Sequence, residues 1–297
     1  MFKRILLPLD GSQLAELAIP YAEELAGRLG SEVILFHACP PDHQPFAHMH
    51  ELYLEGMVNT MQHQIKRKFP RCEGYHVRAE GLLGEPAEVI RDYVQKNKVG
   101  LVILATRGAS GLKVWMLGSV VDKVVRTVNV PTFLVRAKEG HPDESKKSVI
   151  SRILLPLDGS DNSKLAVPYA LEIAKKLKAS ITLFGMAEKA DYTMPYSESL
   201  LKERFRMDKV AQKKIHTYLC DVERELRQEG VHVTNIVTLG IDAAYEVLEQ
   251  EKKTNADLVV MATRGRSPIS RWVFGSVAEK VLLQGDLPLL MIRKVSG

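Results

Sequence analysis

Hydrophobic residues in this chain follow two patterns that alternate along its length. Short apolar runs, such as Leu101–Leu104 and Leu258–Met261, are bounded by polar turns and predict buried strands. Between such runs, apolar residues recur every three or four positions, as at Leu17, Tyr21 and Leu25, which predicts amphipathic helices. Strands that alternate with helices form parallel βαβ units with right-handed crossovers. The pattern therefore predicts a doubly wound α/β sheet with helices on both faces.

The whole pattern occurs twice. Residues 5–36 and 153–184 align without a gap and are identical at 18 of 32 positions, beginning with I-L-L-P-L-D-G-S in both copies. The offset between the copies is 148 residues at the aspartate of this motif and 157 residues at the later glycines Gly108 and Gly265. About nine residues are therefore inserted in the second copy, mostly between its second strand and Gly240. The chain is a tandem duplication.

Each copy predicts the same order of elements. Ser12 and Ser160 are expected to begin the first helix of each copy, and Asp242 is expected to cap a later one. The longest helices are predicted at 47–69 and 198–229. The strands are expected at 4–7, 33–37, 75–80, 101–104 and 131–136, and at 152–155, 181–185, 232–238, 258–261 and 288–293.

The predicted domains are residues 1–138 and 151–297. The segment between them, 139–150, is polar, contains Gly and Pro and has no apolar period, so it is expected to be a linker. Each copy is long enough for a core of its own. The last strand of the second copy, L-L-M-I, is hazardous as an open edge, and we expect it to pair with its counterpart, joining the two domains.

Composition excludes several functions. The chain is 45% hydrophobic and 26% charged, with a formal net charge of +5 and interspersed acids and bases. No long basic run indicates a nucleic-acid partner, and no apolar run reaches the ~18–20 residues of a membrane helix. The three cysteines are odd in number and lack metal-ligand spacing, which favours a reduced, cytoplasmic protein without structural disulfides.

A loop with two widely spaced glycines follows the fourth strand of each copy. Nine residues separate Gly108 from Gly118, and nine separate Gly265 from Gly275; Gly-Ser then begins a helical pattern. A helix N-terminus presents N–H groups and a positive dipole end to an anion, so each loop is a candidate phosphate site. The alternative is a tight connection in which Gly-Ser only caps a helix, but the spacing is kept in both copies. The loop is not a Walker A motif, because Ser119 and Val120 follow Gly118 where that motif has Lys-Ser/Thr.

An aspartate follows the first strand of each copy. Asp10 and Asp158 are candidates to accept a hydrogen bond from a ribose hydroxyl or to bind a divalent ion that bridges phosphates. Asp-Gly-Ser is equally suited to an Asx-type turn. The two roles are compatible and both stay open.

The P-L-D-G-S turn, the G-x9-G-S loop and a last strand that begins with proline each occur twice. With this combination the chain resembles the universal stress protein family, as a tandem two-domain member, over nearly its whole length. The resemblance implies two tandem open five-stranded parallel-sheet domains of Rossmann-like type and, in the nucleotide-binding branch, an ATP site. The positions that match that site are Asp10, Ala38, Gly108, Gly118, Ser119 and Val120 in the first copy, and Asp158, Met186, Gly265, Gly275, Ser276 and Val277 in the second.

The chain departs from the family motif at one position in each copy. Ala105 and Ala262 stand where the motif has its first loop glycine; a methyl there obstructs a phosphate if φ is positive and is harmless if φ is negative. Pro268 stiffens the second loop, and Met186 is bulkier than Ala38 where the base would lie. The first site is therefore expected to be roomier.

We expect a regulatory or stress-response protein that binds adenine nucleotide, ATP with Mg²⁺ assistance, and is not an enzyme. A non-nucleotide interaction protein with vestigial loops and a slow ATPase are the alternatives, and ATP, AMP and cyclic nucleotides stay open as ligands. No metal site is expected, because His43, His48 and His50 have no acidic or cysteine partner at ligand spacing. Whether two chains form a homodimer is open.

Overall fold

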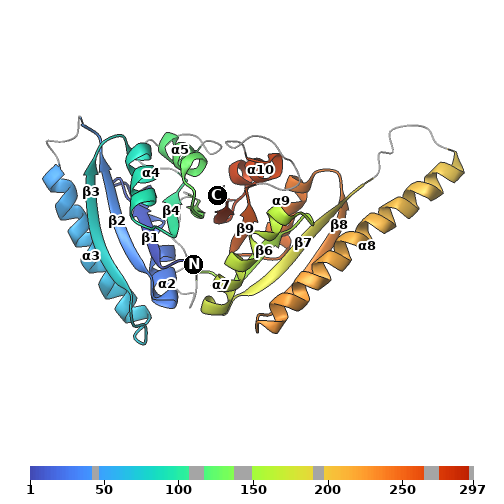
Figure 1. The fold of residues 1–297 in the computed structure, drawn as a ribbon, viewed down its shortest axis with the longest axis horizontal. Helices are drawn as coiled ribbons and strands as arrows, with labels where there is room; N and C mark the ends of the chain where they lie inside the picture. Colours follow the sequence, from blue (N-terminus) through green and yellow to red (C-terminus); the bar gives the residue numbers. More distant parts are fainter. Residues whose placement is uncertain (42–46, 107–116, 137–148, 190–196, 264–273, 294–297) are drawn as a thin grey trace. The chain divides into compact units, whose positions relative to one another are not determined.

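A computed structural model describes residues 1–41, 47–106, 117–136, 149–189, 197–263 and 274–293 (Figure 1). By its contacts the chain divides into two compact units. The first comprises the described parts of Met1–Val149 and Pro288–Gly297, and the second those of Ile150–Ile269 and Phe274–Leu287. The expected linker, 139–150, lies almost wholly outside the described residues, and the predicted domain limits stay a prediction.

The first unit is built on a mostly parallel sheet in the order β3-β2-β1-β4-β5-β10. Neighbouring strands from β3 to β5 pair in parallel, whereas β10 pairs antiparallel with β5. β4 and β5 are buried along their whole lengths and β1 at its three central residues, as continuous apolar runs in a two-sided sheet require. Its strands are β1 (Arg4–Pro8), β2 (Glu32–Cys39), β3 (His76–Leu83), β4 (Leu101–Ala105), β5 (Thr132–Val135) and β10 (Leu289–Ile292).

The second unit repeats the same parallel order, β8-β7-β6-β9. Its strands are β6 (Arg152–Pro156), β7 (Ser180–Glu188), β8 (Val233–Gly240) and β9 (Leu258–Ala262). Counted along the sequence, the described residues of each repeat supply five strands, β1–β5 and β6–β10, although β10 belongs to the first unit by its contacts. The predicted α/β fold class is confirmed. The expected pairing of the two domains and the open question of a homodimer stay predictions.

The helices cover both faces of each sheet. In the first unit, α2 packs on α3 and α4 on α5, and the two pairs lie on opposite faces (Figure 1). In the second unit, α9 and α10 pack together, while α8 contacts β7 and β8. The helices are α1 (Gln13–Glu16), α2 (Ile19–Leu29), α3 (Ala47–Lys68), α4 (Pro86–Lys96), α5 (Ser119–Thr127), α6 (Asp161–Lys164), α7 (Val167–Leu177), α8 (Glu198–Gln228), α9 (Ala243–Lys253) and α10 (Ser276–Gln284).

The first predicted helix of each copy is broken in two. Ser12 and Ser160 begin short helices as expected, each accepting an N–H bond at its hydroxyl, but α1 and α6 end after one turn. Pro20 then occupies the first turn of α2, and Pro168 that of α7. Proline has no N–H and clashes with the preceding turn, so it is accommodated only where a new helix begins. The apolar spacing continues across the break, which is why the pattern predicted one helix.

The insertion in the second copy lengthens one helix. The α3 helix has 22 residues and α8 has 31, a difference of nine residues that equals the growth in offset between the copies. The insertion therefore adds two and a half turns to a surface helix, whereas β7 is only one residue longer than β2 and β8 is as long as β3. No helix in the described part of the chain is long and apolar enough to cross a membrane.

A charged network ties three neighbouring strands of the first unit together. Glu32 of β2 accepts hydrogen bonds from Arg4 of β1 at 2.5 Å and from Arg78 of β3 at 2.8 Å. Arg78 also donates to Glu80 and to the Tyr93 hydroxyl. Burial alone would raise the pKa of Glu32, but the two arginines outweigh it and hold that pKa below its usual range.

We expect Glu32→Gln to destabilise the protein by about 1–2 kcal/mol near neutral pH, because both arginines lose a charged acceptor. A carboxyl with a lowered pKa in the folded state stabilises above its unfolded value of 4.5, and this contribution is lost as the pH falls through the lowered pKa. The difference between the two proteins in urea denaturation should therefore shrink in acid. Glu198→Gln, in an exposed pair with Lys202, is the control and should change little. An equal effect of both variants would contradict the prediction.

Candidate functional site

The Asp-Gly-Ser turns at the ends of β1 and β6 have the same geometry. In the first, Asp10 Oδ1 accepts hydrogen bonds from the Ser12 N–H at 3.0 Å and from its hydroxyl at 2.6 Å; in the second, Asp158 accepts the same two bonds from Ser160. The glycine between them has a positive φ in both copies, +81° at Gly11, as an L side chain rarely would. Both segments therefore form an Asx turn, which holds the aspartate at the carboxyl end of its strand.

The glycine loops close on themselves before their helices begin. The Gly118 N–H donates to the Thr106 carbonyl at 3.1 Å, and the Gly275 N–H donates to the Thr263 carbonyl at 2.9 Å. The α5 and α10 helices then begin at the predicted serines, without a side-chain cap in either case. The first N–H groups of a helix lack intrahelical acceptors, so both helices direct donors to the carboxyl edge of the sheet.

The two alanines that depart from the family motif are accommodated without strain. Ala105 is the last residue of β4, pairs with Val135 and is 6% exposed; Ala262 ends β9 and is 7% exposed. Among the described residues, the non-glycine positions with positive φ are Lys98, Lys178 and Asn255, so neither alanine is among them. The condition under which the methyl is harmless to the backbone is therefore met.

A cavity of about 630 Å³ in the second unit gathers the predicted residues of that repeat. Asp158 enters from the end of β6, Met186 from β7, and Gly275, Ser276 and Val277 from the start of α10. Ala262 lines the same cavity. Five of the six predicted positions of the second copy thus share one space, while Gly265 lies outside the described residues.

An ion pair at this cavity was not expected from the sequence. Lys280, one turn after Ser276 on α10, donates to Asp242 Oδ2 at 2.7 Å. The pKa of Asp242 is held below its usual range, mainly by the hydrogen bond from the Lys280 ammonium and next by the one from the Tyr245 N–H. Asp242 caps α9 as predicted, through the N–H groups of Ala244 and Tyr245. The sequence signal for Lys280 is its position four residues after Ser276, which puts both residues on the same face of α10.

In the first unit the equivalent residues occupy equivalent elements. Asp10 follows β1 and is exposed, Ala38 lies near the end of β2, and Gly118, Ser119 and Val120 start α5. Close to Asp10, the Tyr53 hydroxyl donates to Glu16 at 2.8 Å.

The central parts of both glycine loops lie outside the described residues. They include Gly108, Gly265 and Pro268, as well as Arg107 and Arg264. Whether the first site is roomier than the second stays a prediction.

A family model described as the universal stress protein family matches residues 1–136 and, a second time, residues 150–293. The chain belongs to the universal stress protein family. Both matches fall on the repeats that the sequence defines, so each repeat is a universal stress protein domain in its own right.

Relatives with known names agree with this assignment. A universal stress protein of Methanocaldococcus jannaschii is 29% identical over 46% of this chain and 83% of its own length. One from Thermus aquaticus is 32% identical over 46% of this chain and its full length. Among solved structures, a universal stress protein from Archaeoglobus fulgidus covers 99% of this chain and 97% of its own, with a TM-score of 0.69 and 19% identity, which shows a shared fold.

We expect Ala262→Gly to destabilise this universal stress protein by about 0.5–1 kcal/mol, because glycine in a strand gains freedom in the unfolded chain. Urea denaturation of wild type and variant measures the difference. A gain in stability would show that the alanine strains the end of β9.

Proposed function

We propose that this universal stress protein binds adenine nucleotide, as ATP with Mg²⁺, at the second repeat and at the equivalent site of the first. The observation that carries the proposal is the cavity in the second unit. It unites an aspartate at a strand end, Met186 near the end of the next strand, β7, and the N-terminus of α10. These parts come from three segments that are far apart in sequence, and ligands of open α/β sheets bind at this edge.

The cavity supplies the chemistry that each part of a nucleotide needs. The N–H groups and hydroxyl at Ser276 suit phosphate oxygens. Apolar side chains suit the adenine ring, and the carboxylate of Asp158 is a suitable acceptor for a ribose hydroxyl. The apolar residues are Leu157, Phe184, Met186, Ile241, Val247 and Met261.

The charges of the cavity favour a nucleotide that carries a divalent cation. Asp158, Glu188 and Asp242 are acidic, whereas Lys280 is the basic side chain among the described lining residues. Lys280 already pairs with Asp242. Free ATP would bring more negative charge to this surface, and Mg²⁺, which binds carboxylate and phosphate oxygens together, offsets that repulsion.

Binding rather than turnover is the proposed activity. The wall of the cavity combines recognition groups for base, ribose and phosphate. Phosphoryl transfer would in addition need a residue that positions the nucleophile and a cation that stabilises the transition state. A slow ATPase is the alternative, and a phosphate-release assay with saturating ATP and Mg²⁺ distinguishes it.

We expect Ser276→Glu to abolish ATP binding at the second site without destabilising the fold. A carboxylate at the N-terminus of a helix interacts favourably with the dipole, yet it repels a phosphate at the same place. Calorimetric titration with ATP and Mg²⁺ should count two sites in wild type and one in Ser276→Glu. Ser119→Glu is the matched variant in α5 and should remove the other site.

Two results would contradict this proposal. Absence of heat with wild type, together with an unchanged Tm at saturating ATP, favours an interaction protein with vestigial loops. Unchanged stoichiometry in Ser276→Glu would mean that nucleotide binds elsewhere.

A further inference from the structure

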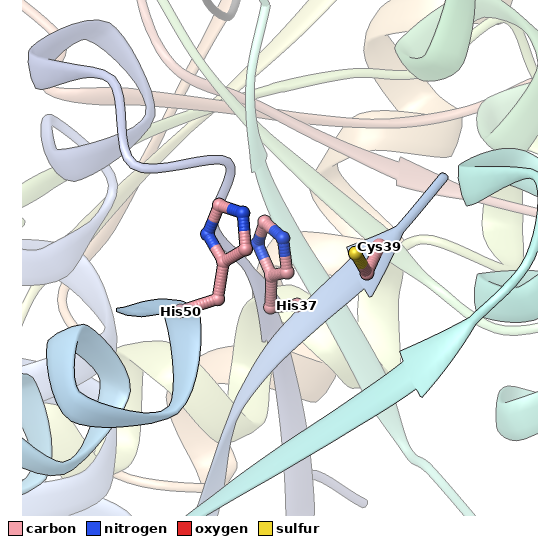
Figure 2. A group of neighbouring side chains, drawn as sticks. All are labelled: His37, Cys39 and His50. Carbon is pink, nitrogen blue, oxygen red and sulfur yellow. The ribbon is translucent and has the colours of Figure 1, made fainter. Parts of the chain in front are cut away.

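Three potential metal ligands lie together in the first unit, on the side of β2 that faces α3. His37 and Cys39 are two residues apart on β2, so their side chains share one face of the strand. His50, from the first turn of α3, completes the group (Figure 2). A ring nitrogen of each histidine and the Cys39 sulfur all lie within 4.8 Å of one another.

The His37 imidazole is held in the form that binds metals. Its Nδ1 lies 2.8 Å from the Leu9 carbonyl, which only accepts hydrogen bonds, so Nδ1 carries the proton. In this tautomer Nε2 carries no proton, so its lone pair is available to a metal ion. His37 is 5% exposed, and Nε2 has no hydrogen-bond partner among the described residues. A carbonyl that orients the far nitrogen of an imidazole is the usual outer partner of a histidine ligand.

The other two side chains differ in exposure. Cys39 is a free thiol at the end of β2 and is 5% exposed. His50 is half-buried at the start of α3, and its ring stacks on that of His37 with centroids 4.0 Å apart (Figure 2). Since only His50 borders solvent, its rotation can admit an ion and turn its nitrogen toward the other two ligands.

The fold does not require this cluster. At the offset of 148 residues that aligns β1 and β2 with β6 and β7, Gly185 stands in place of His37 and Ala187 in place of Cys39. A Cβ at Gly185 would lie 2.5 Å from Ile215 of α8 and 3.2 Å from Leu219, so apolar packing fills the space there. In the second repeat, apolar side chains of α8 fill this position. In the first repeat, the same position holds side chains with atoms that can bind a metal.

We propose that His37 Nε2, Cys39 Sγ and a ring nitrogen of His50 form a binding site for Zn²⁺. Two imidazoles and a thiolate suit this ion, and water is the fourth ligand of a tetrahedral site. On binding, the Cys39 thiol releases its proton to solvent and the sulfur bonds to zinc. The ligand atoms then draw together to about 3.4–3.6 Å, as Zn–N and Zn–S bond lengths demand. The sequence does not indicate this site, because His37 and His50 come from different elements, β2 and α3, and meet only in the fold. Of the histidines near His50 in the sequence, His48 is exposed beside Glu51, and His43 lies outside the described residues.

The test is a titration of the metal-stripped full chain with Zn²⁺ in competition with a chromophoric chelator. Wild type should bind one equivalent, and Cys39→Ser, His37→Asn and His50→Ala should each bind it at least about tenfold more weakly, since losing a ligand costs no less than losing its outer partner. Co²⁺ in place of Zn²⁺ should give a thiolate charge-transfer band in wild type that is absent in Cys39→Ser. Zn²⁺ should also raise the Tm of wild type but not that of His50→Ala, whose half-buried position makes loss of the fold a poor explanation.

Two control variants separate this site from adventitious binding. His48→Ala removes an exposed histidine on the same turn of α3, and Cys220→Ser removes the thiol that lies 3.6 Å from His216 Nδ1 on α8. Both should keep the affinity and the cobalt band of wild type. The proposal is overturned if wild type binds no stoichiometric Zn²⁺, if Cys220→Ser abolishes binding, or if the His37, Cys39 and His50 variants bind as wild type does.

Discussion

Both repeats depend on the reversal of winding direction in a parallel sheet. From β1 the chain runs outward to β2 and β3, then returns to β4 on the other side of β1, so helices cover opposite faces and the loops after β1 and β4 diverge. An Asp-Gly-Ser turn ends one of these strands and a glycine loop leaves the other. The turn needs a left-handed glycine, and the loop closes with an N–H bond back to the strand end. The sheet topology thus separates the loops after β1 and β4, and the Asp-Gly-Ser turn and the glycine loop supply the polar groups between them.

Duplication shows which features this architecture demands. The Asx turns, the loop closures and the helix starts are the same in both units, although the helix that follows the second strand differs by nine residues. That helix packs on an outer part of the sheet, so its length is free to change without moving the strand ends. The same freedom lets the space beneath it hold His37 in one repeat and Ile215 against Gly185 in the other.

Much of the fold could be predicted from the sequence because its signals are local. Apolar runs located the strands to within a few residues, and Asp242 capped its helix as its position before an apolar pattern indicated. The break before Pro20 was overlooked because the apolar spacing spans it. Contacts between distant segments were beyond local patterns: the Lys280–Asp242 pair joins two helices, and the stacking of His50 on His37 depends on where α3 begins over β2.

The proposed zinc site and the expected nucleotide contact of the first repeat lie side by side on β2 without competing. Ala38, the residue expected near the nucleoside, stands between His37 and Cys39, and successive side chains of a strand point to opposite faces. The ligand candidates face α3 (Figure 2), and the Ala38 side chain belongs to the opposite face of β2. Leu9 links the two regions: its carbonyl orients His37, and the next residue is Asp10. A single hydrogen bond therefore connects a proposed zinc ligand to the strand end on which the first Asp-Gly-Ser turn is built.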